Sequence, residues 1–331
     1  MFSNPFFQKD SPMLPHTFPH GGGAQAAAQA WQCDVSDILD LSTGLHPNGV
    51  PDWVANWLKS NADLVAQYPD IQGEPARSHF AEYLGVDAES MLITAGAQAV
   101  IEVIFQAMPW QSMAIEVPCY NEPIRCATRA GCAVHAFEKH TLLPPTDMLW
   151  LTSPHNPTGE EKVFPKNRQG VLDESYMPFA QRKNLGVLDG VIRLGSLTKT
   201  FCVPGLRLGY VVADTTTIKQ LQAWLSPWPA PTLALHLLPK LLVEAKQRDE
   251  MIVQARKRLT TLLEKHNWQV QPSQASFILA QPPQNMPDFA KHRILVRLFP
   301  EWQQLQNWVR LGFPNTAQDW QRLEDVLTTS S

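Results

Sequence analysis

Short runs of apolar residues alternate with amphipathic stretches along most of this chain. We expect five of these runs to be strands: residues 115–118, 148–153, 170–173, 191–197 and 208–213. The stretches between them have helical spacing, and strands that alternate with helices are typical of an α/β domain with a mostly parallel sheet. The pattern therefore predicts a large α/β domain over residues 39–215.

Two further segments flank this domain. Residues 1–38 are rich in proline and aromatic residues, then glycine, and then alanine over residues 24–30, which predicts a short helix in an arm that packs with the small domain. Residues 216–266 have a helical pattern that the prolines of SPWPAPT interrupt. Three strand-like runs and a helix at 318–328 follow. Residues 216–331 are thus expected to form an interdomain helix and a small α+β domain.

Composition excludes several classes of function. The chain has 331 residues, of which 44% are hydrophobic and 18% charged, and its net charge of −4 indicates no nucleic-acid partner. Its most apolar stretch, residues 91–108, contains glutamine and glutamate, so it predicts a buried helix and no membrane contact. The N-terminus lacks a secretory pattern, which favours a cytoplasmic location. Five scattered cysteines without a CxxC pair indicate neither disulfides nor a metal site.

Two motifs could bind a flat, phosphorylated ligand. In LITAGAQAVIEVIF a strand is expected to end at Thr94 and a helix to begin near Ala97, and small residues at such a turn let a phosphate approach backbone N–H groups. A plain tight turn would have the same sequence. In SPHNPTG, residues 153–159, the amide of Asn156 can donate to a phenolate-like oxygen, although the motif could also be only a fixed loop.

A third motif, GVLDESY at residues 170–176, ends a short strand with Asp173. A buried carboxylate needs a cationic or hydrogen-bonding partner, and a protonated pyridine nitrogen is one. Tyr176 could then donate to the O3′ oxygen of the same ring. A helix-capping or salt-bridged aspartate is the alternative.

The fourth motif is GSLTKTFCVPGLRLGY, residues 195–210, which surrounds Lys199 with hydroxyl and apolar residues. Partial burial there would favour the neutral amine that forms an imine. Ser196 and Arg207 could hold a phosphate, because a guanidinium group presents a rigid fork of donors. An ordinary surface lysine fits so apolar a stretch poorly.

In this order, SPHNPTG, LDESY and SLTKTFCVPGLRLGY resemble the class I/II aminotransferase-like enzymes of fold type I, which use pyridoxal 5′-phosphate (PLP). The resemblance runs from about residue 40 to the C-terminus and implies a large PLP-binding domain plus a smaller α+β domain. It implies that Lys199 holds PLP as a Schiff base and that Asp173 pairs with the pyridine nitrogen. It further implies that Asn156 and Tyr176 contact O3′ and that Tyr120, in VPCYNEP, stacks on the ring.

The same resemblance assigns the remaining contacts. The expected phosphate cup consists of Gly96, Ala97, Gln98, Ser196 and Arg207. Tyr68, in QYPD, resembles a tyrosine that reaches the cofactor phosphate of a neighbouring subunit, which implies a homodimer with shared sites. Arg310, in WVRLGFP, matches the arginine that binds the substrate carboxylate, a task that suits guanidinium geometry.

Two segments narrow the choice within the family. HGG at residues 20–22 and DLSTGLHPNGVP at residues 40–51 resemble the threonine-phosphate decarboxylases of cobalamin biosynthesis. This resemblance implies decarboxylation of L-threonine O-3-phosphate to (R)-1-aminopropan-2-yl phosphate. Such a small phosphorylated substrate needs a second anion site, for which His20, Gly21 and Arg297 are available.

Two alternatives stay open. Histidinol-phosphate aminotransferases are similar in size and motifs, and a non-catalytic protein of the same fold is the second alternative. One departure bears on the latter: the segment between Asn156 and Asp173 is shorter than the usual crossover, which predicts a stunted or absent helix there.

Overall fold

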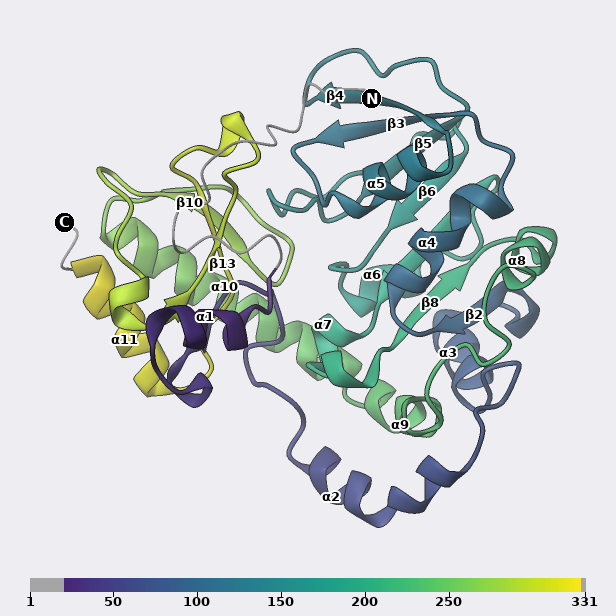
Figure 1. Ribbon diagram of the computed structural model, residues 1–331, viewed down its shortest axis with the longest axis horizontal. Helices are drawn as coiled ribbons and strands as arrows, with labels where there is room; N and C mark the ends of the chain where they lie inside the picture. Colours follow the sequence, from purple (N-terminus) through teal and green to yellow (C-terminus); the bar gives the residue numbers. More distant parts are fainter. Residues whose placement is uncertain (1–20, 329–331) are drawn as a thin grey trace. The chain divides into compact units, whose positions relative to one another are not determined.

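The computed structural model of the chain is described over residues 21–328 (Figure 1). The chain forms two compact units. The large unit comprises residues 49–156 and 160–250. The described part of the small unit comprises residues 21–48, 157–159 and 251–328.

A seven-stranded sheet forms the centre of the large unit, with the strand order β2-β8-β7-β6-β5-β3-β4. Only β8 runs antiparallel to its neighbours. The expected mostly parallel sheet is therefore confirmed. The strands are β2 (Met91–Thr94), β3 (Ser112–Val117), β4 (Ala133–Glu138), β5 (Met148–Thr152), β6 (Gly170–Asp173), β7 (Val191–Ser196) and β8 (Gly209–Val212).

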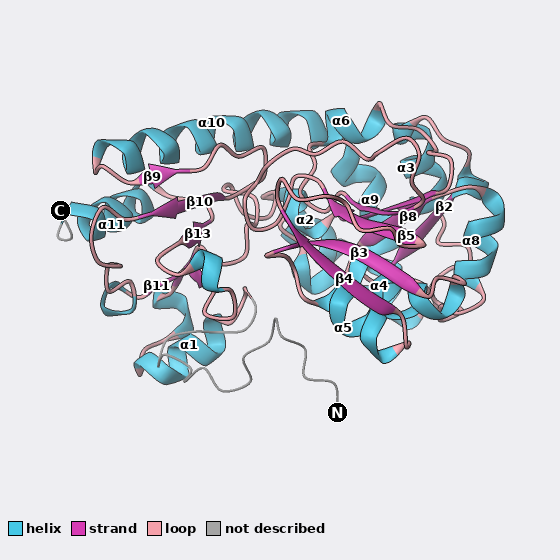
Figure 2. Cartoon of the chain, turned by 90° about the horizontal axis from the view of Figure 1, so that it is seen from above, coloured by secondary structure: helices cyan, strands magenta, loops and turns pink. Residues whose placement is uncertain are grey.

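Helices cover both faces of this sheet (Figure 2). Met91 and Ile93 of β2 are buried in a cluster with residues of α3 and α9, whereas Phe105 of α4 stacks on Trp150 of β5. Side chains alternate between the faces of a strand, so each face buries its own apolar set. The helices are α2 (Trp53–Ser60), α3 (Ala76–Leu84), α4 (Ala97–Ala107), α5 (Glu122–Arg129), α6 (Phe179–Lys183), α7 (Thr198–Phe201), α8 (Thr215–Gln222) and α9 (Thr232–Leu242).

The connection between β5 and β6 contains no helix, although these strands are parallel neighbours. Phe164 of this connection packs against a buried cluster that includes Leu149 and Leu172. The expected stunted or absent helix is thus confirmed as absent. The apolar face of the two strands is covered by loop residues instead.

The small unit contains a four-stranded antiparallel sheet in the order β12-β13-β10-β9 and a parallel pair formed by β1 and β11. Its helix α11 (Ala317–Thr328) contributes Trp320 and Leu323 to a core that also buries Leu259 and Leu263. The remaining elements are α1 (Ala24–Trp31), β1 (Leu39–Asp40), β9 (Gln269–Val270), β10 (Ile278–Gln281), β11 (Ile294–Leu295), β12 (Arg297–Leu298) and β13 (Val309–Leu311).

The boundaries of the units differ from those expected at residues 38 and 215. Residues 39–48 belong to the small unit, because β1 pairs with β11 and Leu41 is buried in the small unit's core. The helices α8 and α9 belong to the large unit, where Leu235 and Leu238 fill its core. The second boundary falls at residues 250/251, inside α10 (Ala245–Lys265). Within residues 21–328, no helix is long and apolar enough to cross a membrane.

Candidate active site

The predicted cofactor residues of the large unit gather at one edge of its sheet. The strands β2, β5, β6 and β7 are parallel and end at Thr94, Thr152, Asp173 and Ser196. Because β8 is antiparallel, it begins at this same edge, directly after Arg207 and Leu208. Ligands of open α/β sheets bind outside the carboxyl ends of the strands, so sheet topology brings these motifs together.

Lys199 lies in the one-turn helix α7 and is partly buried. Its ammonium nitrogen is 5.6 Å from the centre of the Tyr176 ring. The turn is held by buried Arg248, whose Nε donates to the carbonyl oxygen of Thr200 at 2.6 Å and whose Nη2 donates to that of Gly49 at 2.5 Å. Sequence reasoning missed Arg248, because nothing in the local pattern of α10 distinguishes it from the other basic residues there.

Asp173 ends β6 and is buried. Burial raises the pKa of its carboxyl group, whereas hydrogen bonds from Ser175 and the charge of Lys199 act in the opposite direction. The backbone N–H of Ser175 donates to Asp173 Oδ1 at 3.0 Å. A desolvated carboxylate of this kind gains most from a cationic partner, as the expected pyridinium nitrogen would be.

Asn156 lies in the loop that follows β5 and is partly exposed. Ser153 fixes the start of this loop, since its N–H donates to the carbonyl oxygen of Asp173 at 2.9 Å and its hydroxyl to that of Lys162 at 2.8 Å. The loop that carries Asn156 is therefore tied to the end of β6, next to Asp173. A single ring ligand that contacts both Asn156 and Asp173 requires the two residues to lie near each other in this way.

Two glycines and an arginine lie together at the start of α4. Gly96 has φ +80°, and a Cβ added to it would lie 2.6 Å from Arg207 Nη2. A Cβ added to Gly209 would lie 2.5 Å from the backbone nitrogen of Ala97. Only glycine leaves room at both positions, so the guanidinium group reaches the helix N-terminus, where an anion is stabilised. The hydroxyl oxygens of Ser196 and Thr198 are 2.6 Å apart at the adjoining strand end.

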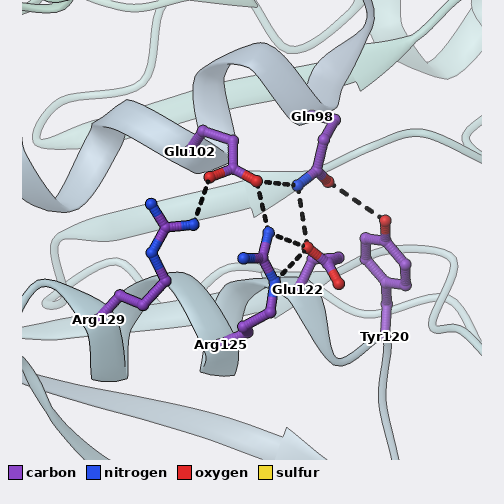
Figure 3. Close-up of polar contacts among 6 residues, drawn as sticks. All are labelled: Gln98, Glu102, Tyr120, Glu122, Arg125 and Arg129. Atoms are coloured by element: carbon purple, nitrogen blue, oxygen red, sulfur yellow. Dashed lines mark hydrogen bonds and ion pairs between the residues drawn. The ribbon is translucent and has the colours of Figure 1, made fainter.

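Gln98 and Tyr120 are in direct contact (Figure 3). The Tyr120 hydroxyl donates to Gln98 Oε1 at 3.2 Å. Burial and nearby charges, including those of Glu122 and Asp173, raise the pKa of Tyr120. The structure therefore links the expected stacking residue to a residue of the expected phosphate cup.

Tyr68 follows the 3-10 helix η2 (Ala62–Ala66) and is 80% exposed. Its ring centre is 5.0 Å from that of Trp228. The hydroxyl of Thr232, the first residue of α9, donates to the carbonyl oxygen of Gln67 at 2.8 Å. The Tyr68 segment is thus held at two points, by Trp228 of the proline-containing linker and by the start of α9. Its exposure is consistent with a contact to another subunit.

Arg310 of β13 is buried in the small unit and its guanidinium carbon is 4.7 Å from the centre of the Phe277 ring. Its Nη2 donates to the carbonyl oxygen of Ser42 at 2.5 Å. Ser42 also joins the glycine segment, because its hydroxyl accepts from the N–H of Gly22 at 3.0 Å. A Cβ added to Gly21 would lie 2.5 Å from the Ser42 carbonyl oxygen, which excludes a larger residue. His20 lies outside the described residues.

Arg297 is the direct cross-strand partner of Arg310 in the small unit. Directly opposed residues of an antiparallel pair share one face of the sheet, so both arginine side chains leave the same face. Burial lowers the pKa of Arg297, and the charge of Arg310 acts in the same direction. Arg297 also forms an ion pair with Glu301 and donates to the Leu298 carbonyl oxygen at 2.7 Å. Any anion bound here must share Arg297 with Glu301.

These residues fit a flat, phosphorylated pyridine cofactor. A cradle of glycines with an arginine and a helix N-terminus suits its phosphate, and a buried carboxylate suits its ring nitrogen. A lysine beside that carboxylate suits covalent attachment. A mostly parallel α/β sheet that carries this set at its carboxyl edge defines the fold type I class of PLP-dependent enzymes.

Comparison with known proteins gives the family. The sequence profile of aminotransferase class I and II matches residues 36–319, so the chain belongs to this family of PLP-dependent enzymes. A threonine-phosphate decarboxylase of Pseudomonas aeruginosa is 28% identical over 333 residues, covering 93% of this chain and 96% of that protein.

Two other relatives carry the name of a different activity. A histidinol-phosphate aminotransferase of Archaeoglobus fulgidus is 26% identical over 305 residues, covering 85% of this chain and 84% of that protein. The crystal structure of a histidinol-phosphate aminotransferase from Sinorhizobium meliloti in complex with pyridoxal-5′-phosphate superposes with a TM-score of 0.80 at 16% identity, over 98% of this chain and 99% of that one. The similarities establish a PLP-dependent enzyme and leave its reaction to be proposed.

Proposed function

We propose that this protein decarboxylates L-threonine O-3-phosphate to (R)-1-aminopropan-2-yl phosphate, a step of cobalamin biosynthesis. The observation that carries the proposal is the meeting of three segments in the small unit. Gly22 and Arg310 both bind Ser42, through its hydroxyl and its carbonyl oxygen respectively. The glycine segment and the DLSTG segment are the two that resemble threonine-phosphate decarboxylases, and both lie at the expected carboxylate-binding arginine.

The residues of the large unit have separate tasks in this reaction. Lys199 attaches the cofactor, and Gly96, Ala97, Ser196 and Arg207 surround its phosphate. Asp173 holds a proton on the ring nitrogen, which is the form in which the bound cofactor supplies an electron sink. Asn156 and Tyr176 donate to the ring oxygen.

The reaction breaks the bond between Cα and the carboxylate carbon of the substrate. Carbon dioxide leaves, the electron pair stays on Cα, and a proton then takes the place of the lost group. Arg310 binds the carboxylate before it leaves, and backbone N–H groups near Gly21 together with Arg297 bind the phosphate. Arg297 takes part by dividing its donors between Glu301 and the substrate.

The first test is attachment of the cofactor. Purified protein should be yellow, and borohydride should fix the cofactor covalently on Lys199, as peptide mass spectrometry would show. A colourless protein that ignores added PLP would contradict the enzyme assignment and favour a non-catalytic protein. Lys199→Ala is the matched variant that should lose the labelled peptide.

The second test separates decarboxylation from transamination. Incubation with L-threonine O-3-phosphate should release carbon dioxide without an acceptor keto acid. The named aminotransferase relatives support one rival activity, histidinol-phosphate transamination. Turnover of histidinol phosphate that depends on 2-oxoglutarate, without release of carbon dioxide from threonine phosphate, would establish that rival.

We also propose that the enzyme is a homodimer in which Tyr68 of each subunit reaches the cofactor phosphate bound by the other. Its 80% exposure supports this, since a buried tyrosine could not serve a second subunit. The exposed side chain of Trp228 adjoins Tyr68 in the same unit and adds apolar surface for such a contact.

A further inference from the structure

The side-chain amide of Gln98 lies between two carboxylates and a phenol (Figure 3). Its nitrogen is 2.9 Å from Glu102 Oε1 and 3.0 Å from Glu122 Oε2, and its oxygen accepts from the Tyr120 hydroxyl at 3.2 Å. An amide nitrogen carries two hydrogens, and here each has a carboxylate acceptor. The reverse orientation would place the amide oxygen against two anions. The carboxylates therefore fix which end of the amide faces Tyr120.

Arginines on α5 keep these carboxylates in place. Arg125 Nη2 is 2.5 Å from both Glu102 Oε1 and Glu122 Oε2, whereas Arg129 Nη1 contacts only Glu102, at 3.2 Å. The side chain of Glu122 is 14% exposed and that of Glu102 is 34% exposed. Ionised carboxylates only accept hydrogen bonds, so neither acid can donate to the Gln98 oxygen. Glu122 is the less solvated of the two and is the stronger constraint.

We propose that Glu122 is a positioning residue for the cofactor, acting through Gln98 on the ring of Tyr120. By holding the Gln98 oxygen toward the phenol, Glu122 fixes the hydroxyl end of the ring that stacks on PLP. Gln98 then serves the cofactor phosphate through its backbone N–H at the start of α4, because both hydrogens of its amide are taken. This inference rests on the proposed cofactor contacts of Gln98 and Tyr120.

Two properties of Tyr120 support the role of an orienting hydrogen bond. The residue precedes α5 in a loop, so no regular element fixes its side chain. Burial raises the pKa of its hydroxyl, which therefore keeps its proton and remains a donor to Gln98. Removing the Gln98 acceptor would take away the hydrogen bond that sets the direction of this partly buried hydroxyl.

A double-mutant cycle tests the proposal. PLP is titrated into the apoproteins of the wild type, Glu122→Gln, Gln98→Met and the double variant. The visible circular dichroism of the bound cofactor gives both the affinity for PLP and the orientation of the PLP ring. Each single variant should bind PLP about threefold to tenfold more weakly, the size of one ordinary hydrogen bond. In the Gln98→Met background, Glu122→Gln should cause less than about a twofold further change, because its route to the cofactor is already lost.

Arg129→Gln is the matched control, since Arg129 belongs to the same charge network but contacts neither Gln98 nor Tyr120. It should change affinity and dichroism clearly less than Glu122→Gln does, because Arg129 pairs with Glu102 and not with Glu122. If the effects of the two substitutions on PLP affinity were additive, the positioning role would be overturned. The same holds if Glu122→Gln left both the affinity and the dichroism unchanged. These outcomes differ from failure of the proposed function, which would appear as a wild-type protein that does not bind PLP.

Discussion

Asp173 and Glu174 are neighbours in the sequence but lie in different surroundings. Asp173 lies at the expected cofactor site, where the positive charge of Lys199 acts to lower the pKa of its carboxyl group. Glu174 is fully buried, forms an ion pair with Arg193 and accepts from the Tyr210 hydroxyl at 2.5 Å. Successive side chains of an extended chain point in opposite directions, so one carboxylate lies at the expected cofactor site and the next pairs with Arg193 of β7.

Arginine geometry gives the first prediction. Arg310→Lys should raise KM for L-threonine O-3-phosphate about tenfold to hundredfold, because a lysine cannot form the paired hydrogen bonds of a guanidinium group.

Arg297→Lys should raise KM for the phosphorylated substrate but leave any binding of unphosphorylated L-threonine unchanged. Steady-state kinetics and competition by L-threonine measure both effects. Arg256→Lys, a substitution at another arginine of the small unit, is the control. Equal effects of Arg297→Lys on both ligands would remove Arg297 from the phosphate site.

His155 gives a prediction on pH. Burial, together with the charges of Lys162 and Lys139, lowers the pKa of His155 to about 3. The unfolded chain then binds more protons than the folded one below the ordinary histidine pKa, so this group makes unfolding easier as pH falls. Its contribution should reduce the free energy of unfolding by about 1.4 kcal/mol per pH unit between roughly pH 6.5 and pH 3.

Urea unfolding of the apoprotein between about pH 5 and about pH 7 measures this slope. His155→Gln has no titratable group at that position and should show a shallower loss of stability toward acid. Identical slopes for the two proteins would mean that His155 is protonated in the folded state. Above the ordinary histidine pKa the group binds no proton in either state, so the slopes should converge.

At the scale of elements, the buried ion pair joins the end of β6 to β7. Arg193 Nη2 is 3.0 Å from Glu174 Oε1, and both side chains are fully buried. Arg193→Met should cost about 3–5 kcal/mol of stability, since it leaves a buried carboxylate without its cation. The double variant Glu174→Gln/Arg193→Met should lose less than the single one. Urea midpoints decide this, and a double variant no more stable than Arg193→Met would contradict the prediction.

Some elements were accessible to sequence reasoning and others were not. The strands β5, β6, β7 and β8 were expected within a residue or two, because each is a short apolar run buried on both faces. For β2 only the end at Thr94 was expected, and the expected buried helix over residues 91–108 was wrong for residues 91–94, which form this strand. The edge strand β4 was missed, since its residues are alternately exposed and half-buried and form no continuous apolar run. Helices α9 and α10 were expected as one pattern, and only the break at residues 243–244 separates them.

At the scale of the whole molecule, the assignment of Tyr68 depends on a second subunit. An exposed tyrosine with its ring against Trp228 has no evident task within its own chain. Sharing a site between subunits makes each catalytic centre depend on two copies, which is a common property of symmetric dimers. In the proposed dimer, the oligomeric state would be part of the function and not only of stability.

Mixing two inactive variants tests this sharing. Tyr68→Ala and Lys199→Ala homodimers should each have low activity, whereas their co-expressed mixture should recover part of it. In a mixed dimer one site combines an intact Lys199 from one subunit with an intact Tyr68 from the other. Sedimentation gives the oligomeric state of each variant and of the mixture. No recovery, with dimers present, would mean that Tyr68 acts in its own subunit or not at all.

The sequence alone identified the expected cofactor residues of the large unit, because each belongs to a local motif at the end of a strand. Parallel strands carry such motifs to one edge whatever their order, so their convergence needed no knowledge of register. Tertiary structure decided the partners: Ser42 for Arg310, Glu122 for Gln98 and Glu301 for Arg297. Most of these contacts join residues far apart in the chain, and they depend on strand order, register and helix packing. No local pattern of hydrophobic and polar positions specifies those relations.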